Sequence, residues 1–308
     1  MLAPGQGAQT PGMFAPWLEV PGARERIGEW SEVAGLDLKR LGTTADADEI
    51  KDTAVTQPLV VALSLLVFEQ LARRVELPAD LVAAGHSVGE LTAAAVVGVL
   101  NPNDTIALAA VRGREMATAC ATEPTGMAAV LGGDQDEVLA RLAELGLDPA
   151  NRNAASQIVA AGPADALDRL VAEPPARAKV ARLKVAGAFH TRFMTPARQA
   201  LADHAARITV NDPRHTLLSN ADGAAVGSGA EVLRRLVAQV AAPVRWDKCM
   251  AAMRERGVTA TIELPPAGPL TGMVKRELKG MTTLAIKKLE DLDAAAELVA
   301  ARAVGALA

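Results

Sequence analysis

The stretch LVAAGHSVGELTAAAVV, residues 81–97, decides the fold of this 308-residue chain. The apolar run 81–84 predicts a short strand, and the alanine-rich run 91–97 predicts a helix that packs on a sheet. Between them, Gly85-His86-Ser87-Val88-Gly89 matches G-x-S-x-G, which in a strand–turn–helix context forms a nucleophile elbow. Glycines suit this turn because the strand and helix backbones crowd there. The alternative interpretation is a tight turn that holds a serine without a chemical role.

Length and composition restrict the class of protein. A chain of 308 residues suits one large domain or one domain with an insert. The chain has no tyrosine, so tyrosine cannot serve as its acid, base or nucleophile. A net charge of −4 without a long Lys/Arg run argues against a nucleic-acid partner. Cys120 and Cys249 fit a reduced compartment, and the four histidines lack metal-type spacing, so we expect no metal and no cofactor.

The N-terminus and the apolar runs predict a soluble cytoplasmic protein. A Pro-Gly turn follows Met1 within three residues, so no signal peptide is expected. The longest strongly apolar run, 58–68, is interrupted by Ser64 and is too short to span a bilayer. We expect a monomer that does not associate with membranes.

Alternating strands and helices predict the fold class. They indicate an α/β protein with a doubly wound, mostly parallel sheet and an α/β-hydrolase-like core. The predicted helices of this core are 57–75, 104–118, 195–206, 231–240, 246–256 and 270–278, and its predicted strands are 81–84, 215–219 and 259–264.

Residues 123–187 differ in pattern from the rest and predict a small insertion. Strand-like runs at 126–131, 157–161 and 180–185 alternate with helical runs at 134–145 and 164–172, and a fourth strand is left open. This order suits a ferredoxin-like α+β subdomain. We therefore predict one large domain from residues 1–122 and 188–308, with 123–187 inserted as the small one.

A serine hydroxyl becomes a nucleophile only when a base takes its proton, and histidine is suited to that role near neutral pH. His190 follows a predicted strand and a glycine turn, which is where open α/β sheets place functional side chains. His204 lies within a helix and His215 in a turn, so we expect both to pack or to face solvent. His86 adjoins the serine, and we expect it to line the entrance or to contact substrate.

The histidine of such a site must be oriented, and the reaction needs two preorganised N–H donors. Asp203 and Asp222 are candidate triad acids without a supporting motif, and a backbone carbonyl is the alternative. For the oxyanion hole, we predict the N–H of Val88, directly after the serine, and the N–H of Gln6 in the glycine-rich N-terminal loop.

Five motifs resemble one family in content and order. They are Pro4-Gly5-Gln6-Gly7-Ala8-Gln9, Gly85-His86-Ser87-Val88-Gly89-Glu90, Arg112 with Met116, Gly187-Ala188-Phe189-His190 and Pro243-Val244-Arg245-Trp246. From residue 3 to about residue 285, the chain resembles the malonyl-CoA:acyl-carrier-protein transacylases of bacterial type II fatty-acid synthesis, an acyltransferase-domain family.

The resemblance implies a ping-pong acyl transfer. Ser87 would attack the thioester of malonyl-CoA with His190 as base, and the phosphopantetheine thiol of acyl carrier protein would then take the malonyl group. In this family a main-chain carbonyl orients the histidine, and the matching position here is Gln239. No cofactor is implied beyond the substrate and the group carried by the partner. Fatty-acid and polyketide synthesis both stay open as the pathway.

The resemblance also assigns the acyl pocket. Arg112 matches the arginine that pairs with the malonyl carboxylate, and a guanidinium fork holds a carboxylate through two charge-assisted bonds. The alternative is a helix arginine paired on the surface. Met116 lies one helical turn on, and with Phe189 it would shape a pocket for a short unbranched acyl group. In this family, Ala-Phe-His at residues 188–190 goes with malonyl.

Two departures from the family pattern are visible. Only Met1 to Ala3 precede the Pro-Gly-Gln loop, so either the start is truncated or the first strand is short. The late turn, 264–268, reads Leu-Pro-Pro-Ala-Gly where many relatives have Gly-Pro-Gly, which questions any role that needs unusual backbone angles there.

Two other functions compete with malonyl transfer. A thioesterase or esterase would use the same elbow but needs a triad acid. A silent module that only binds carrier protein would not need Ser87 or His190. Because such carriers are acidic, two basic clusters are candidate docking sites, and ordinary solvated helix faces are the alternative. The clusters are Lys275, Arg276 and Lys279, and Arg192 with Arg198.

Overall fold

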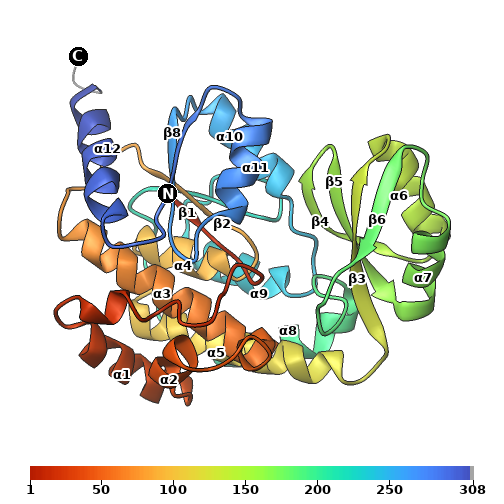
Figure 1. Ribbon diagram of the computed structural model, residues 1–308, viewed down its shortest axis with the longest axis horizontal. Coiled ribbons are helices and arrows are strands. Elements are labelled where there is room, and N and C mark those ends of the chain that lie inside the picture. Colours follow the sequence, from red (N-terminus) through yellow and green to blue (C-terminus); the bar gives the residue numbers. More distant parts are fainter. Residues whose placement is uncertain (306–308) are drawn as a thin grey trace.

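The computed structural model describes residues 1–305 and contains two separate sheets (Figure 1). The larger sheet has five strands in the order β7-β2-β1-β8-β9, and every neighbouring pair is parallel. Its strands are β1 (Leu2–Ala3), β2 (Val82–Gly85), β7 (Thr216–Leu218), β8 (Ala260–Glu263) and β9 (Thr282–Ala285). β1 has two residues and lies in the middle, with Leu2 opposite Ala84 on one side and Glu263 on the other.

Helices cover both faces of the large sheet, as the doubly wound prediction requires. The helices around it are α1 (Ala23–Ala34), α2 (Leu38–Thr43), α3 (Thr53–Ala72), α4 (Gly89–Val96), α5 (Pro102–Cys120), α8 (Thr195–Ala205), α9 (Gly229–Gln239), α10 (Trp246–Glu255), α11 (Pro269–Glu277) and α12 (Asp291–Gly305). Successive strand residues enter different cores, because side chains alternate across a strand. Ala83 packs with α3, α4 and α5, whereas Ala84 packs with α10 and α11. The predicted fold class is confirmed.

The central helix α3 begins earlier than predicted. The sequence predicts a start at Gln57 with Pro58 in the first turn, but the helix begins at Thr53 and contains Pro58 in its interior. The reason is a cap: the Asp52 carboxylate accepts a hydrogen bond from the Ala54 N–H at 2.8 Å. By length and composition α3 could cross a membrane, but most of it is buried inside the protein, as in a core helix.

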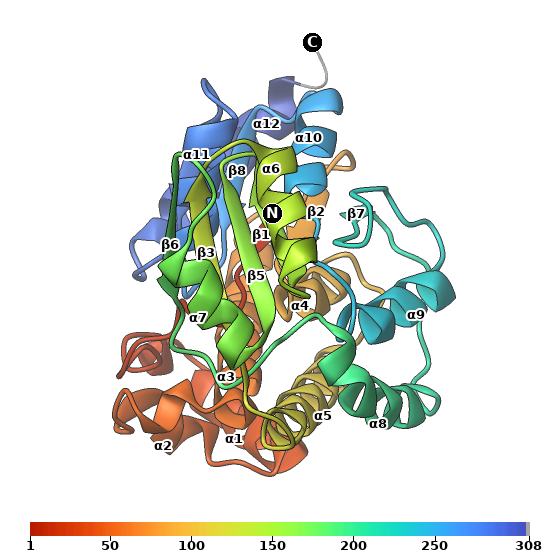
Figure 2. The same ribbon diagram turned by 90° about the vertical axis from the view of Figure 1, so that its right-hand side faces the viewer.

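The smaller sheet is antiparallel, with strand order β4-β5-β3-β6. Its elements are β3 (Thr125–Gly132), α6 (Gln135–Glu144), β4 (Asp148–Ala154), β5 (Gln157–Pro163), α7 (Ala164–Ala172) and β6 (Ala178–Arg182). This β-α-β-β-α-β order is ferredoxin-like. α6 and α7 cover its outer side (Figure 2), so its other side faces the large sheet. The structure also places β6 two residues earlier than predicted, where Ala178 pairs with Gly132.

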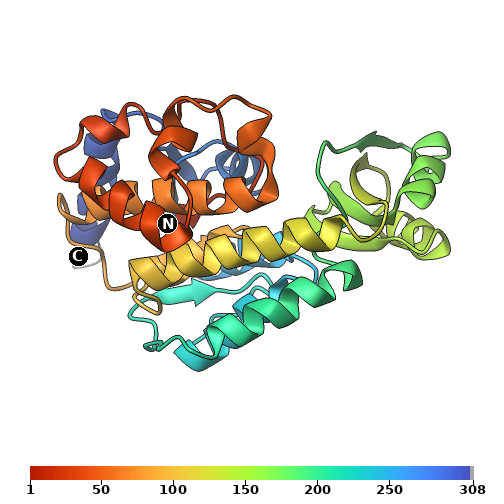
Figure 3. The same cartoon turned by 90° about the horizontal axis from the view of Figure 1, so that it is seen from below.

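Two helices connect the large and small sheets. α5 leads from the large sheet into β3, and α8 runs beside it on the return path (Figure 3). His190 lies just before α8, so the chain returns from the small sheet directly into the space above the elbow. This topology brings Ser87, between β2 and α4, close to a residue 103 positions later.

Candidate active site

Ser87 occupies a sharp turn between a buried strand and a helix. β2 ends at Gly85 and α4 begins at Gly89, as the motif predicts. Ser87 has a φ of +54°, a left-handed conformation that few side chains adopt without strain. The strain turns the hydroxyl outward at the N-terminus of α4, and it persists because the surrounding backbone determines the turn.

Three glycines are required by close approach of the backbone. A Cβ atom on Gly85 would collide with the Gly89 carbonyl, and one on Gly89 would collide with the Ala3 carbonyl. A Cβ on Gly5 would lie 2.7 Å from the His86 carbonyl oxygen. The N-terminal loop therefore packs directly against the elbow, which any larger residue at these positions would prevent.

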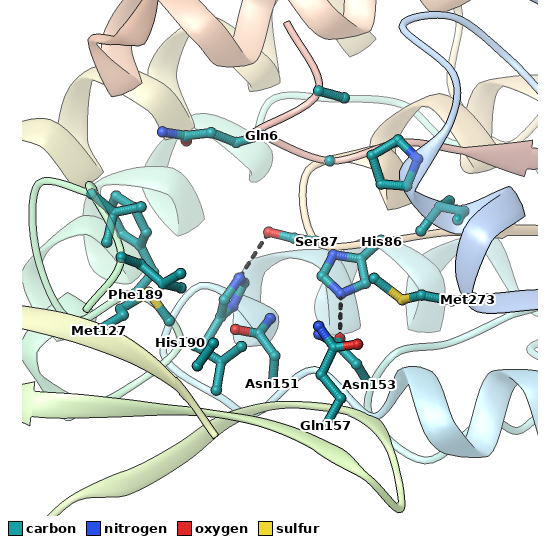
Figure 4. A pocket seen from close by; sticks show the side chains of 18 of the residues that line it. Gln6, His86, Ser87, Met127, Asn151, Asn153, Gln157, Phe189, His190 and Met273 are labelled. Carbon is teal, nitrogen blue, oxygen red and sulfur yellow. Dashed lines mark hydrogen bonds between the residues drawn. The ribbon is translucent and has the colours of Figure 1, made fainter. Parts of the chain in front are cut away.

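Ser87 and His190 are in direct contact (Figure 4). The Ser87 Oγ lies 2.7 Å from the His190 Nε2, and the His190 Nδ1 lies 2.9 Å from the main-chain oxygen of Gln239. A carbonyl only accepts, so Nδ1 carries the proton and Nε2 accepts the hydrogen bond from the serine. His190 is also in the left-handed region, with φ of +62°. Both members of the pair are thus held in unusual backbone conformations.

The charge state of His190 follows from its surroundings. Burial lowers its pKa to about 3, and the nearby Arg112 cation contributes in the same direction. The imidazole is therefore neutral at physiological pH. A neutral imidazole with a free Nε2 is ready to take the serine proton.

Arg112, on α5, is 2% exposed and lies beside Ser87. Its guanidinium donates to the Gln57 Oε1 at 2.6 Å, the Gln239 Oε1 at 2.9 Å and the Ser87 Oγ at 3.2 Å. Burial lowers its pKa to about 10, so the group stays charged at neutral pH. All three acceptors are neutral, and no carboxylate of the described residues forms an ion pair with Arg112. A buried cation without a direct counter-ion is suited to receive an anionic ligand.

A network of buried polar side chains is hydrogen-bonded to the backbone of the elbow. The Asn220 side chain accepts from the Ser87 N–H at 2.9 Å and donates to the Gly85 carbonyl at 2.8 Å. The Gln239 Nε2 donates to the Ser87 carbonyl at 3.0 Å. The Glu90 carboxylate accepts from the Asn220 N–H at 2.6 Å and from the Gln239 side chain. The turn that presents Ser87 is thus bonded on both sides of the serine.

The hydroxyl of Ser87 opens into a pocket of about 260 Å³ between the two sheets. Met116 and Phe189 line it near the Ser87–His190 pair, as predicted. The small sheet contributes both apolar and polar groups to its wall (Figure 4), including Met127, Ala129, Asn151, Asn153 and Val159. His86 also lines the pocket, and its Nε2 lies 2.9 Å from the Asn153 Oδ1. The site is therefore built from both sheets.

Two backbone N–H groups near the serine have no hydrogen-bond acceptor among the described residues. Val88 caps the start of α4, and Gln6 lies in the loop that packs on the elbow. In the described part of the chain, neither N–H has a hydrogen-bond acceptor. The Gln6 side chain instead donates to Thr53 at 3.2 Å, which anchors the loop to α3. These N–H groups are the two that the sequence predicts as oxyanion donors.

The structure separates the remaining candidates from the site. Asp222 pairs with Arg235 at 2.8 Å and Asp203 accepts from Gln199 at 3.1 Å, so neither candidate acid touches His190. Burial raises the pKa of the Cys120 thiol to about 11 and also raises that of Cys249, so both are unreactive thiols. Among residues 1–305, no group of three His, Cys, Asp or Glu side chains is arranged to hold a metal.

Several site residues were not predicted from the sequence. They are Gln57, Glu90, Asn151, Asn153 and Asn220. Four of them have a recognisable signal: Gln57 interrupts an apolar helix, Asn220 follows the end of a parallel strand, and Asn151 and Asn153 are both placed on β4, two residues apart. Polar residues in buried surroundings are hydrogen-bonded, which is why these residues belong to networks.

Comparison with known proteins identifies relatives along almost the whole chain. Residues 2–306 match the family profile of the acyl transferase domain. A malonyl CoA-acyl carrier protein transacylase of Mycobacterium tuberculosis is 58% identical over 299 residues, 97% of this chain and 99% of the relative. The protein of the same name from Escherichia coli K12 is 32% identical over 302 residues, 96% of this chain and 97% of the relative.

Solved structures agree with the sequence relatives. The crystal structure of MCAT from Mycobacterium tuberculosis has a TM-score of 0.93 and 57% identity, and the match covers 96% of this chain and 98% of that chain. A structure titled as a type II PKS acyl-carrier protein in complex with its malonyl-transacylase has a TM-score of 0.89 and 29% identity. That match covers 97% of this chain and 98% of the other.

Proposed function

The chain belongs to the acyl transferase family, and we propose that it transfers a malonyl group from malonyl-CoA to the phosphopantetheine thiol of an acyl carrier protein. One observation carries the choice of acyl group. The Ser87–His190 pair lies beside Arg112, a buried cation that has only neutral partners. The acyltransferase activity is the one that the relatives' names state.

The first half-reaction forms a malonyl-serine. The Ser87 Oγ attacks the thioester carbonyl carbon while its proton passes to the His190 Nε2. The carbon–sulfur bond then breaks, and the coenzyme A sulfur leaves with the proton from His190. The Gln239 carbonyl keeps Nδ1 protonated throughout, so the nitrogen that accepts and returns the proton is always Nε2, which faces the serine.

The oxyanion of the tetrahedral intermediate is assigned to the N–H groups of Gln6 and Val88. Both are free in the structure, and the N-terminus of α4 adds a favourable dipole. Donors held in place before the reaction stabilise charge without reorganising, and each is typically worth about 3–4 kcal/mol of barrier. Support for this assignment comes from the rigid packing of the Gly5 loop on the elbow.

Arg112 selects the acyl group. When malonyl enters, its carboxylate can replace the neutral oxygens that the guanidinium now contacts, including the Gln57 Oε1. A fork that donates two parallel bonds discriminates in favour of a carboxylate over a methyl group. Met116 and Phe189 leave room for a short unbranched chain beside it.

The second half-reaction returns the enzyme to its starting state. The carrier's thiol attacks the malonyl-serine, His190 takes the thiol proton, and the proton is finally returned to the Ser87 Oγ. The hydrolase alternative lacks support, because Asp203 and Asp222 lie elsewhere and the relatives are named transacylases. The silent-module alternative does not explain an aligned Ser87–His190 pair.

We place the carrier at the rim formed by α11. Met273 of this helix lines the pocket, and Arg276, less than one turn later, donates to Gln157 on the opposite rim at 2.9 Å. Lys275 is exposed on α11 and Lys279 is exposed in the turn that follows it, so basic side chains gather at this end of the helix. Both predicted clusters are partly paired: Arg276 contacts Glu277, and Arg192 pairs with Asp148 and lies over the Phe193 ring. We favour α11 because its Met273 lines the pocket. Monomeric state and cytoplasmic location stay predictions.

Intact mass measurement tests the function. The protein is mixed separately with malonyl-CoA, acetyl-CoA and methylmalonyl-CoA, and we expect a malonyl adduct on the wild type that forms faster than either other adduct. Ser87→Ala should give no adduct, whereas the matched control Ser228→Ala, at an exposed position, should react normally. An adduct on Ser87→Ala, or none on the wild type, would contradict the proposal. Release of free malonate faster than malonyl-carrier would instead indicate a hydrolase.

A further inference from the structure

Glu90 is a buried carboxylate that the reaction above does not use. It lies in the first turn of α4, three residues after Ser87, and is 5% exposed. Its Oε1 accepts from the Asn220 N–H, and its Oε2 accepts from the Gln239 side chain. The Asn220 N–H and the Gln239 Nε2 can only donate, so both carboxylate oxygens act as acceptors, as in the ionised form.

The Gln239 side chain connects this anion to the Arg112 cation. Its Nε2 donates toward Glu90, and its Oε1 accepts from the Arg112 Nη2 at 2.9 Å. The amide has one orientation that satisfies both neighbours. If it were reversed, its carbonyl would face the Glu90 carboxylate and the Ser87 carbonyl, and its NH₂ would face the guanidinium. Acceptors would then face acceptors and donors would face donors.

We propose that Glu90 is a positioning residue, which acts through the Gln239 amide to hold the Arg112 guanidinium in place for a carboxylate on the acyl group. This inference rests on the proposed malonyl transfer. It predicts that losing the Glu90 charge weakens malonyl selection more than it weakens acyl transfer as such. The Gln239 Nε2 would then keep only the Ser87 carbonyl and the Asn220 Oδ1 as acceptors. Its side chain would be held less firmly, and so would the Arg112 guanidinium that it contacts.

The charge on Glu90 depends on several neighbours. From α5 it faces Arg112, and from α9 it faces Arg235, which is itself paired with Asp222 and Glu231. The Cys249 thiol of α10 lies on the same side and is neutral. Burial raises the pKa of Glu90 to about 7, and the hydrogen bonds and the two cations act against that rise. Glu90 therefore gains its proton between pH 8 and pH 6, where His190 stays neutral.

The test is the ratio of malonyl-CoA to acetyl-CoA acylation rates, measured as kcat/KM at pH 6, 7 and 8. A malonyl carboxyl group with an ordinary pKa stays ionised over this range. For the wild type we expect the ratio to fall about fivefold or more from pH 8 to pH 6, since a group with pKa near 7 changes from mostly ionised to mostly protonated. Glu90→Gln should give the low ratio at every pH, with acetyl transfer largely retained.

A matched variant controls for the loss of a buried carboxylate. Glu263 is fully buried on β8 and accepts from the N–H groups of Leu270 and Thr271 at 3.1 and 2.7 Å. Glu263→Gln should lower the thermal midpoint but keep the wild-type ratio and its pH dependence. If Glu90→Gln does not fold, a wild-type ratio that stays constant across the pH range in which the Glu90 carboxyl is seen to gain its proton by infrared spectroscopy would overturn the inference. So would a folded Glu90→Gln protein with the wild-type ratio. Failure of malonyl transfer itself would show as no malonyl adduct on the wild type.

Discussion

Replacing Arg112 by alanine should reverse the acyl preference. The guanidinium can donate two parallel bonds to a malonyl carboxylate, and a hydrogen bond to a charged group contributes about 1.5–3 kcal/mol. Two such bonds correspond to about 3–6 kcal/mol, or roughly 10²- to 10⁴-fold in kcat/KM for malonyl-CoA. Acetyl-CoA has no carboxylate, so it loses only the contribution that Arg112 makes to Ser87 through the 3.2 Å contact. We expect its rate to stay level or rise.

The assay is release of coenzyme A thiol in the presence of carrier protein, measured with each thioester. Arg112 fills buried space and donates hydrogen bonds to Gln57 and Gln239, so the alanine variant needs a matched control variant. Arg112→Lys keeps the charge but loses the fork, so its malonyl rate should lie between those of alanine and wild type. An equal loss for both substrates, or a malonyl loss below tenfold in a folded variant, would refute the carboxylate clamp.

Three further predictions follow from the site. His190→Ala should lower the acylation rate by about 10²- to 10⁴-fold, the usual contribution of a general base. The circular dichroism spectrum should stay unchanged, and a smaller loss of rate would mean that another group takes the proton. Burial lowers the pKa of His190 to about 3, so its neutral base form persists as the pH falls. The rate of acylation by acetyl-CoA should therefore be constant from pH 8 to 5, and a rate that falls with a midpoint near pH 6.5 would contradict this. Phe189→Ser enlarges the pocket beside Met116, so methylmalonyl-CoA should gain relative to malonyl-CoA in intact-mass competition.

The features that the sequence predicts well are local ones. The elbow follows from G-x-S-x-G with an apolar run on either side, because the glycines are required by contacts within the same turn and with the adjacent loop. The helix pattern is also local, and most predicted helices of the large sheet agree with the structure within three residues at each end. The sequence does not place β4, because Asp148–Ala154 is polar and lacks β-branched residues. It forms because β5 pairs with it.

Long-range contacts account for what could not be predicted. His190 is predicted as the base from its place after a strand and a glycine turn, whereas the role of Gln239 is implied only by the resemblance. No spacing rule places residues 103 and 152 positions from Ser87 beside it. No role for Asn220 or Glu90 follows from the sequence, although Glu90 stands in a family motif, because neither residue type specifies a chemistry by itself. Their importance follows from burial, which leaves each with a hydrogen-bonding requirement that only the folded chain reveals.

A carbonyl, in place of an acid, suits the orientation of His190 because of Arg112. The Gln239 side chain already contacts the guanidinium at 2.9 Å, and its main chain contacts the imidazole. A triad carboxylate in this position would add an anion to the buried network that holds Arg112, and under the proposed malonyl transfer it would compete with the acyl carboxylate for that cation. A neutral carbonyl fixes the tautomer of His190 without adding charge. Among residues 1–305, no acid contacts His190 and the hydrogen-bond partners of Arg112 are all neutral. Both features fit the proposal that the strongest partner for Arg112 arrives with the substrate.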